Sequence, residues 1–99
     1  MKKMSLVEFK GTFSAKAPPA ELNPQEKALW FAGKGEWEKA HEIVQDLNDP
    51  FSGHIHAFLH RQEGDISNAR YWYNIAGENM PSVSLDKEWE LLFEGRPIS

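Results

Sequence analysis

The sequence predicts a single all-α domain. Its 99 residues suit one domain with its own core and leave no room for a second. Apolar residues recur at helical spacing in several segments, and Gly or Pro signals end these segments. No segment alternates apolar and polar residues convincingly with period 2, so we expect no sheet. The chain has no cysteine, which excludes disulfides, zinc–cysteine sites and thiol chemistry.

The N-terminal part, residues 1–22, predicts a short helix followed by a Pro-rich connector. Ser5 and Glu8 have the spacing of a capping box, which favours a helix over about residues 6–14. Two consecutive prolines further on cannot continue a helix and indicate an extended segment. We therefore divide the single domain into this segment and a helical-repeat part over residues 23–99.

Five further helices are predicted after the connector, each from an apolar stripe and from signals at its ends. Asn23-Pro24 is the strongest start, because Asn is a favoured cap and Pro suits the first helical position. Ser84 and Gly95 mark the start and the end of the last helix in the same way. The expected ranges are about 24–32, 36–47, 51–63, 66–78 and 85–94.

One short pattern occurs twice, over residues 35–40 and again over residues 64–69, 29 residues later. Each copy reads Gly, acid, large apolar residue, two variable positions, Ala. Gly permits the positive φ of a tight turn, the acid suits the start of a helix, and Ala allows two helices to approach closely. The pattern predicts two helical hairpins with turns at Gly33–Gly35 and Gly64–Asp65.

Residues of both copies stand at the spacings of a known repeat class. The second copy supplies Gly64, Asp65, Ala69, Tyr73, Ala76 and Pro81, and the first supplies Phe31, Gly35, Trp37 and Ala40. In these residues the chain resembles the tetratricopeptide and Sel1-like repeats. The runs Gly35–His41, His56–Asp65 and Tyr71–Tyr73 also look like a group of short bacterial proteins of unassigned function. The resemblance implies two tetratricopeptide-like hairpins, flanked by a short N-terminal and a C-terminal capping helix.

The same resemblance implies a binding surface, because the first helix of each hairpin would line a concave groove. The matching positions are His54, Phe58, Arg61, Gln25 and Leu29. Arg61 could hold a carboxylate, with Phe58 receiving an apolar side chain beside it. The leading hypothesis is a binding or adaptor module that recognises a protein segment or a small anionic ligand, without catalysis. The structural alternative pairs Arg61 with Glu63, Asp65 or Glu38.

All four histidines fall between residues 41 and 60. His56, His60 and Glu63 stand at i, i+4 and i+7, so they share one face of a helix and could ligate a metal. The spacing is loose, and a polar flank of an amphipathic helix is the favoured explanation. We therefore expect no metal or other cofactor, and keep a small metal-dependent enzyme or metal binder as the alternative. His41 is interpreted as a neutral histidine at the edge of the core.

A third alternative is a structural subunit of a homo-oligomer. Trp30, Tyr71 and Trp72 do not all fit on inward faces, so they either pack under the capping helices or anchor an interface. The sequence favours packing and does not predict an oligomeric state.

Charge and hydropathy narrow the possible partners. Residues 1–20 carry four Lys and one Glu, a charge of +3, and the rest carries seven basic and fourteen acidic residues, a charge of −7. An acidic body repels phosphate backbones, so no nucleic-acid partner is expected. No stretch approaches the roughly 20 apolar residues that span a membrane, and no signal-peptide core follows the basic start. We expect a cytoplasmic protein without membrane contact.

Overall fold

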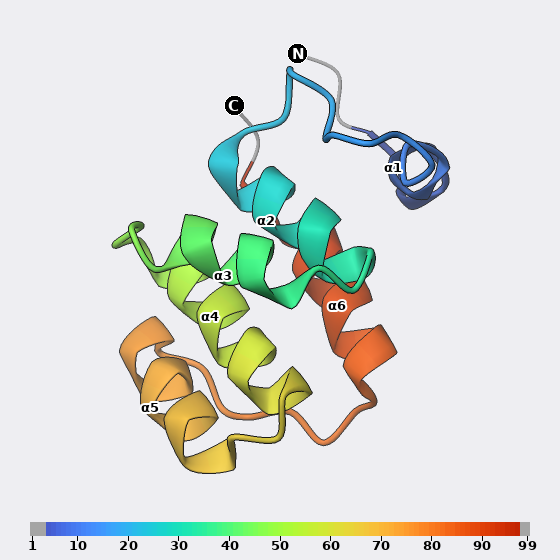
Figure 1. Ribbon diagram of the computed structural model, residues 1–99. Helices are drawn as coiled ribbons and strands as arrows, with labels where there is room; N and C mark the ends of the chain where they lie inside the picture. Colours follow the sequence, from blue (N-terminus) through green and yellow to red (C-terminus); the bar gives the residue numbers. More distant parts are fainter. Residues whose placement is uncertain (1–3, 98–99) are drawn as a thin grey trace.

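The fold consists of six α-helices, as a computed structural model that describes residues 4–97 shows (Figure 1). No strand occurs within these residues, so the predicted all-α class is confirmed. The helices, in chain order, are α1 (Leu6–Gly11), α2 (Pro24–Gly33), α3 (Trp37–Val44), α4 (Pro50–Gln62), α5 (Ile66–Ala76) and α6 (Leu85–Glu94). The last helix has its predicted bounds, whereas α1 and α3 end earlier than predicted. After α3 the backbone N–H of Leu47 donates to the carbonyl of Val44, which tightens the chain into a turn.

Local signals in the sequence set most of the helix starts. Ser5 and Asn23 each form a capping box with a Glu three residues further on. Asp49 caps α4 by accepting a hydrogen bond from the backbone N–H of Ser52. Pro50 occupies the first helical position there, where no N–H is needed.

Two glycine turns join four of the helices into the pairs α2·α3 and α4·α5 (Figure 1). Gly35 has a φ of 79° and Gly64 a φ of 86°, in the left-handed region that side chains with a Cβ disfavour. The predicted turns at Gly33–Gly35 and Gly64–Asp65 are therefore confirmed.

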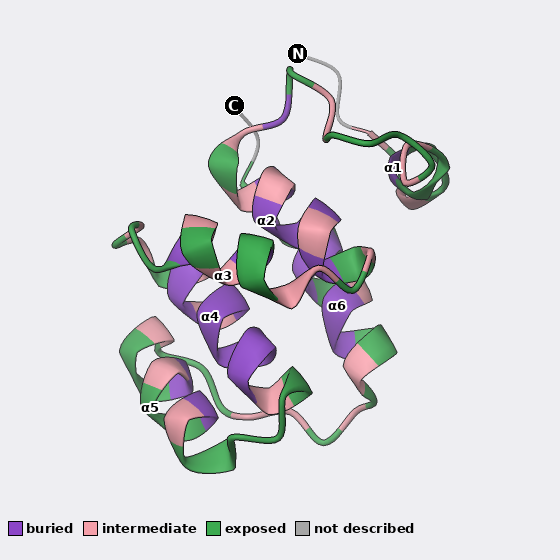
Figure 2. Ribbon diagram, in the orientation of Figure 1, coloured by how far each residue is buried: buried purple, intermediate pink, exposed green. Residues whose placement is uncertain are grey.

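The central helix is α4, which contacts α2, α3, α5 and α6. Figure 2 shows that it is buried over much of its length. Its side chains Ile55, Phe58 and Leu59 join the main hydrophobic core, to which α1, α2, α3 and α6 also contribute. Because α4 is surrounded, polar residues along it lie in or beside the interior, and this places the candidate site.

Aromatic contacts hold the N-terminal helix α1 against α6. Phe9 of α1 is fully buried, and its ring centroid lies 4.8 Å from that of Phe93 in α6. Trp30 is also fully buried, and its Nε1 donates to the hydroxyl oxygen of Thr12 at 2.8 Å. Trp30 therefore packs beneath the N-terminal segment, as the packing interpretation predicts.

The two flanking helices leave one end of the fold uncovered. α6 packs against α2 and α4, and Nε1 of its Trp89 donates to the carbonyl of Leu29 at 2.9 Å. The outer face of α5 keeps Tyr71 58% and Ile75 50% exposed. The expectation that the capping helices cover both exposed ends is wrong. The apolar stripe of α6 packs against α2 and α4, so the outer face of α5 stays uncovered.

Candidate metal centre

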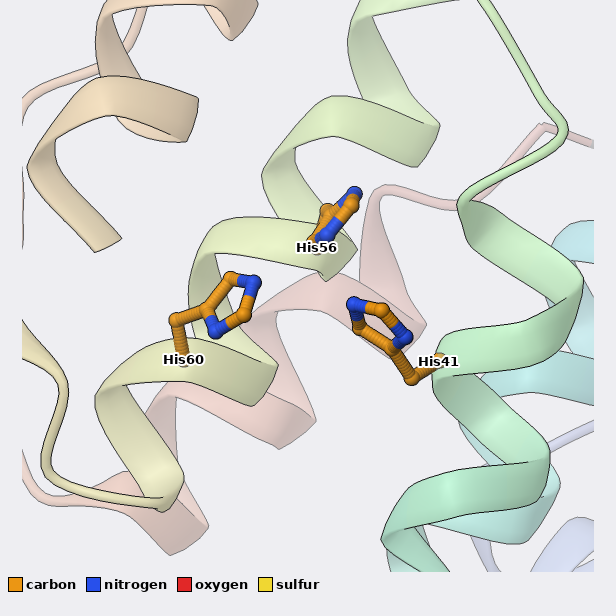
Figure 3. Close-up of side chains that lie close together, drawn as sticks. All are labelled: His41, His56 and His60. Atoms are coloured by element: carbon orange, nitrogen blue, oxygen red, sulfur yellow. The ribbon is translucent and has the colours of Figure 1, made fainter. Parts of the chain in front are cut away.

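Three of the four histidines meet between α3 and α4 (Figure 3). His41 comes from α3, and His56 and His60 lie one turn apart on α4. One ring nitrogen of each lies within 4.8 Å of one ring nitrogen of the other two. His56 and His60 are buried, with exposed fractions of 4% and 6%, and His41 is at the rim. The sequence alternative named His56 and His60 correctly as neighbours on one face.

Two tryptophans fix the planes of two of these rings. Trp37 stacks on His41, with centroids 4.7 Å apart and an interplanar angle of 10°. Trp72 of α5 stacks on His56 at 3.9 Å and 13°. Nε1 of Trp37 donates to the carbonyl of Leu59 at 2.6 Å, which ties this indole to α4. Each stacked ring therefore has limited freedom to turn away from the cluster.

The third ring is fixed by a carboxylate. Nδ1 of His60 lies 2.7 Å from Oε1 of Glu63, and the Glu63 side chain is 39% exposed. A carboxylate only accepts, so Nδ1 of His60 is the donor, and Nε2 is the nitrogen that offers a lone pair to a metal when the ring is neutral. Glu63 therefore occupies the position from which a carboxylate orients a metal-binding imidazole. The sequence alternative placed Glu63 among the ligands, whereas here it hydrogen-bonds to one of them.

Burial favours the neutral form of His41 and His56. Burial, together with the neighbouring His41 and His60, lowers the pKa of His56 to about 4. Burial, followed by the charge of His60, also lowers the pKa of His41. Among the described residues, none forms a hydrogen bond with a ring nitrogen of His41 or His56. Two neutral imidazoles thus have lone pairs that no described residue uses.

The predicted binding residues lie elsewhere, and most are engaged in the interior. Leu29 is fully buried and Phe58 is 2% exposed. The amide of Gln25 donates to Asp49 and Ser52 at 3.1 and 3.3 Å. The prediction that Leu29 and Phe58 line a partly exposed groove is therefore wrong. The reason is that α6 packs over the surface of α2 and α4 that would form this groove. Ligand binding through the other predicted positions stays a prediction.

The remaining two predicted residues, His54 and Arg61, converge on a buried carboxylate. Glu88 of α6 is 2% exposed, and Nη1 of Arg61 donates to its Oε1 at 2.8 Å. The hydroxyl of Tyr73 donates to Oε2 of Glu88 at 2.5 Å, and Nε2 of His54 lies 3.3 Å from the same oxygen. Arg61 also donates to the carbonyl of Val83. The predicted local partners of Arg61, namely Glu63, Asp65 and Glu38, do not pair with it in the described structure.

Sequence reasoning missed two residues, His41 as a cluster member and Glu88 as the buried carboxylate. His41 stands on the apolar face of its helix, and that position alone indicates only a residue at the core edge. Glu88 interrupts the apolar stripe of α6, a signal that could have indicated a buried partner. Neither partner set was predictable, because α3 and α6 meet α4 only in the tertiary fold.

Comparison of the chain with protein-family models, with curated proteins and with solved structures found no match. Within residues 4–97, no helix has the length and apolar character needed to cross a membrane.

Proposed function

We propose that the protein binds one divalent transition-metal ion, of the class of zinc, through His41, His56 and His60. The convergence of three ring nitrogens within 4.8 Å of one another carries the proposal. Zinc–nitrogen bonds of about 2.0–2.1 Å in a tetrahedral site place ligand nitrogens roughly 3.3 Å apart. The ring nitrogens, which lie within 4.8 Å of one another, would have to approach by at most about 1.5 Å. Imidazole suits zinc, copper and nickel, so the chemical class of the ion follows from the donors.

The number and kind of ligands support a site that keeps a coordination position open. Three protein ligands with a fourth position for solvent are typical of catalytic zinc sites, whereas structural sites are usually closed by four. His41 at the rim gives the site a path to solvent. Relative to the sequence alternative, His41 replaces Glu63 as the third ligand, and Glu63 orients His60. This proposal replaces the expectation that the protein takes no metal.

Zinc is expected to bind the parent protein with one-to-one stoichiometry and a Kd below about 1 μM, as measured by calorimetric titration. Cobalt in place of zinc should give the visible absorption of a nitrogen-ligated ion. Free zinc at 100 times its Kd should stabilise the fold by about 2.7 kcal/mol through mass action. A parent protein that binds neither ion more tightly than about micromolar would contradict the proposal.

The informative variants are His41→Phe and His56→Phe. Phe keeps a ring for Trp37 or Trp72 to stack on, and removes the ligand nitrogen. Each should weaken zinc binding by at least about 100-fold, and Glu63→Gln should weaken it by about 10- to 100-fold. His54→Gln is the matched control, because it removes the one histidine outside the cluster and should leave zinc affinity unchanged.

A second candidate function, taken from the repeat resemblance, is a binding or adaptor module. It is supported by the two helix pairs with matching glycine turns, which are compatible with a tetratricopeptide-like arrangement. Its specific groove has little support, since Phe58 and Leu29 are buried. The metal proposal has the more specific observation behind it.

A further inference from the structure

The rings of the three clustered histidines form a nearly equilateral triangle. Their centroids are 4.6 Å apart for His41 and His56, 4.9 Å for His56 and His60, and 5.3 Å for His41 and His60. The His56 and His60 rings are close to parallel, with 24° between their planes, and the His41 ring stands across them at 88° and 76°. Figure 3 shows the three side chains at the corners of this triangle.

The size of the triangle distinguishes between coordination geometries. With metal–nitrogen bonds of about 2.0–2.1 Å, two imidazole centroids lie roughly 5 Å apart in a tetrahedral complex. They lie about 6 Å apart when their nitrogens stand on opposite sides of the ion, as two of any three ligands must in a square-planar complex. All three observed separations are shorter than that. No pair of these rings is therefore placed for opposite positions on one ion.

Two tryptophans hold two corners of the triangle from outside. Trp37 stacks on His41 from one turn earlier on α3, and its Nε1 donates to the carbonyl of Leu59 in α4. Trp72 stacks on His56 from α5, and both indoles are half-buried. A stacked indole favours one plane for the imidazole against it. Rotation of either histidine to a position opposite another ligand would therefore break a stack.

We propose that Trp37 and Trp72 are positioning residues that make the histidine site selective for ions that accept tetrahedral coordination. Zinc and cobalt(II) belong to this class, whereas copper(II) prefers a square-planar or tetragonal arrangement. The inference rests on the proposed metal site and concerns which ion that site takes. In a flexible site copper(II) binds more tightly than zinc, as the general affinity order of divalent ions requires. The two stacks oppose this order, because copper(II) can reach its preferred geometry only by breaking one of them.

The test is the ratio of copper(II) affinity to zinc affinity, measured for each protein at pH 7 by competition with a metal chelator. The double variant Trp37→Leu with Trp72→Leu keeps apolar side chains and removes both flat rings. Its preference for copper(II) over zinc should exceed that of the parent by at least about tenfold, because His41 and His56 become free to turn. Its cobalt(II) complex should also lose the strong visible absorption of a tetrahedral ion. A purely structural role of the indoles would weaken the binding of both ions alike and leave the ratio unchanged.

Further variants separate stacking from a general loss of stability. Trp72→Leu alone should move the ratio in the same direction by a smaller factor, and Trp72→Phe, which keeps a flat ring over His56, should retain the parent ratio. Phe31→Leu is the matched control, because it removes another half-buried ring, whose ring contacts among the described residues are with Trp30 and Lys39. It should also retain the parent ratio. An unchanged or smaller ratio in the leucine variants, with zinc still bound by the parent, would overturn this inference alone, whereas a parent that binds no zinc would overturn the proposed metal site and this inference with it.

Discussion

Replacing Glu88 by Ala is expected to lower the free energy of unfolding by about 3–5 kcal/mol. The change removes the anion that Arg61, Tyr73 and His54 share. The Arg61 guanidinium would then be a partly buried charge without its counter-ion, and the Tyr73 hydroxyl would lose its acceptor. Urea unfolding of the variant and the parent at pH 7 measures the difference.

Asp86→Ala is the matched control for this result, because Asp86 lies on the same helix and is exposed. Its effect should stay within about 0.5 kcal/mol. Arg61→Ala should approach the cost of Glu88→Ala, since it leaves the buried carboxylate unpaired. A cost below about 1 kcal/mol for both Arg61→Ala and Glu88→Ala would mean that this network does not hold α4, α5 and α6 together.

Acid should weaken the same network. Burial by itself would raise the pKa of Glu88, but the hydrogen bonds from His54, Tyr73 and Arg61 outweigh burial and hold the pKa below its ordinary value of 4.5. A lowered folded-state pKa stabilises the fold fully above the unfolded value, and this contribution is lost as pH falls through the folded value. Between pH 5 and pH 3, Glu88→Gln should therefore lose less stability than the parent. Parallel losses in the two proteins would contradict this assignment.

Replacing Trp30 by Ala is expected to cost about 3–5 kcal/mol, as truncation of a buried aromatic residue usually does. Trp30 is fully buried, and its ring contacts Phe13 and Phe31 edge-on, with centroids 5.9 and 5.2 Å away. The variant also loses the hydrogen bond from Nε1 to Thr12, through which α2 holds the N-terminal segment. Urea unfolding measures the cost.

Tyr71→Ala provides the comparison for Trp30→Ala, because it also truncates an aromatic residue but one that is 58% exposed. Its effect should stay below about 1 kcal/mol. Trp30→Phe should cost less than Trp30→Ala, because it keeps part of the buried ring. If Tyr71→Ala proved as damaging as Trp30→Ala, the inward and outward positions of these aromatics would be assigned wrongly.

The sequence predicted what local signals determine. Ser84 and Gly95 mark the ends of α6, because capping acts within one turn. Gly35 and Gly64 form the predicted turns, because glycine adopts a positive φ without the strain that a Cβ would cause. The ends of α1 and α3 were overestimated, since apolar spacing continues past the point where the backbone leaves the helix. Contacts between distant helices had no such local signal.

In the candidate site, too, only the part that lies on a single helix was predictable from the sequence. His56 and His60 were predictable as a pair, because a spacing of four places both on one side of any helix. His41 could be added only once α3 was known to pack on α4, since 15 residues separate it from His56. Arg61 was assigned partners close to it in sequence or in the neighbouring hairpin, whereas its carboxylate comes from a helix 27 residues away.

The uncovered outer face of α5 has a consequence for motion. This helix packs mainly against α4, and Tyr73 links it to α6 through Glu88. A helix with one packed face is a natural unit of local opening, so amide hydrogens of α5 should exchange with solvent sooner than those of α4. Each opening would lift Trp72 off His56 and uncover one wall of the histidine cluster. Zinc held by His56 should slow this opening only to the extent that the ion binds more tightly when Trp72 is stacked on that ring.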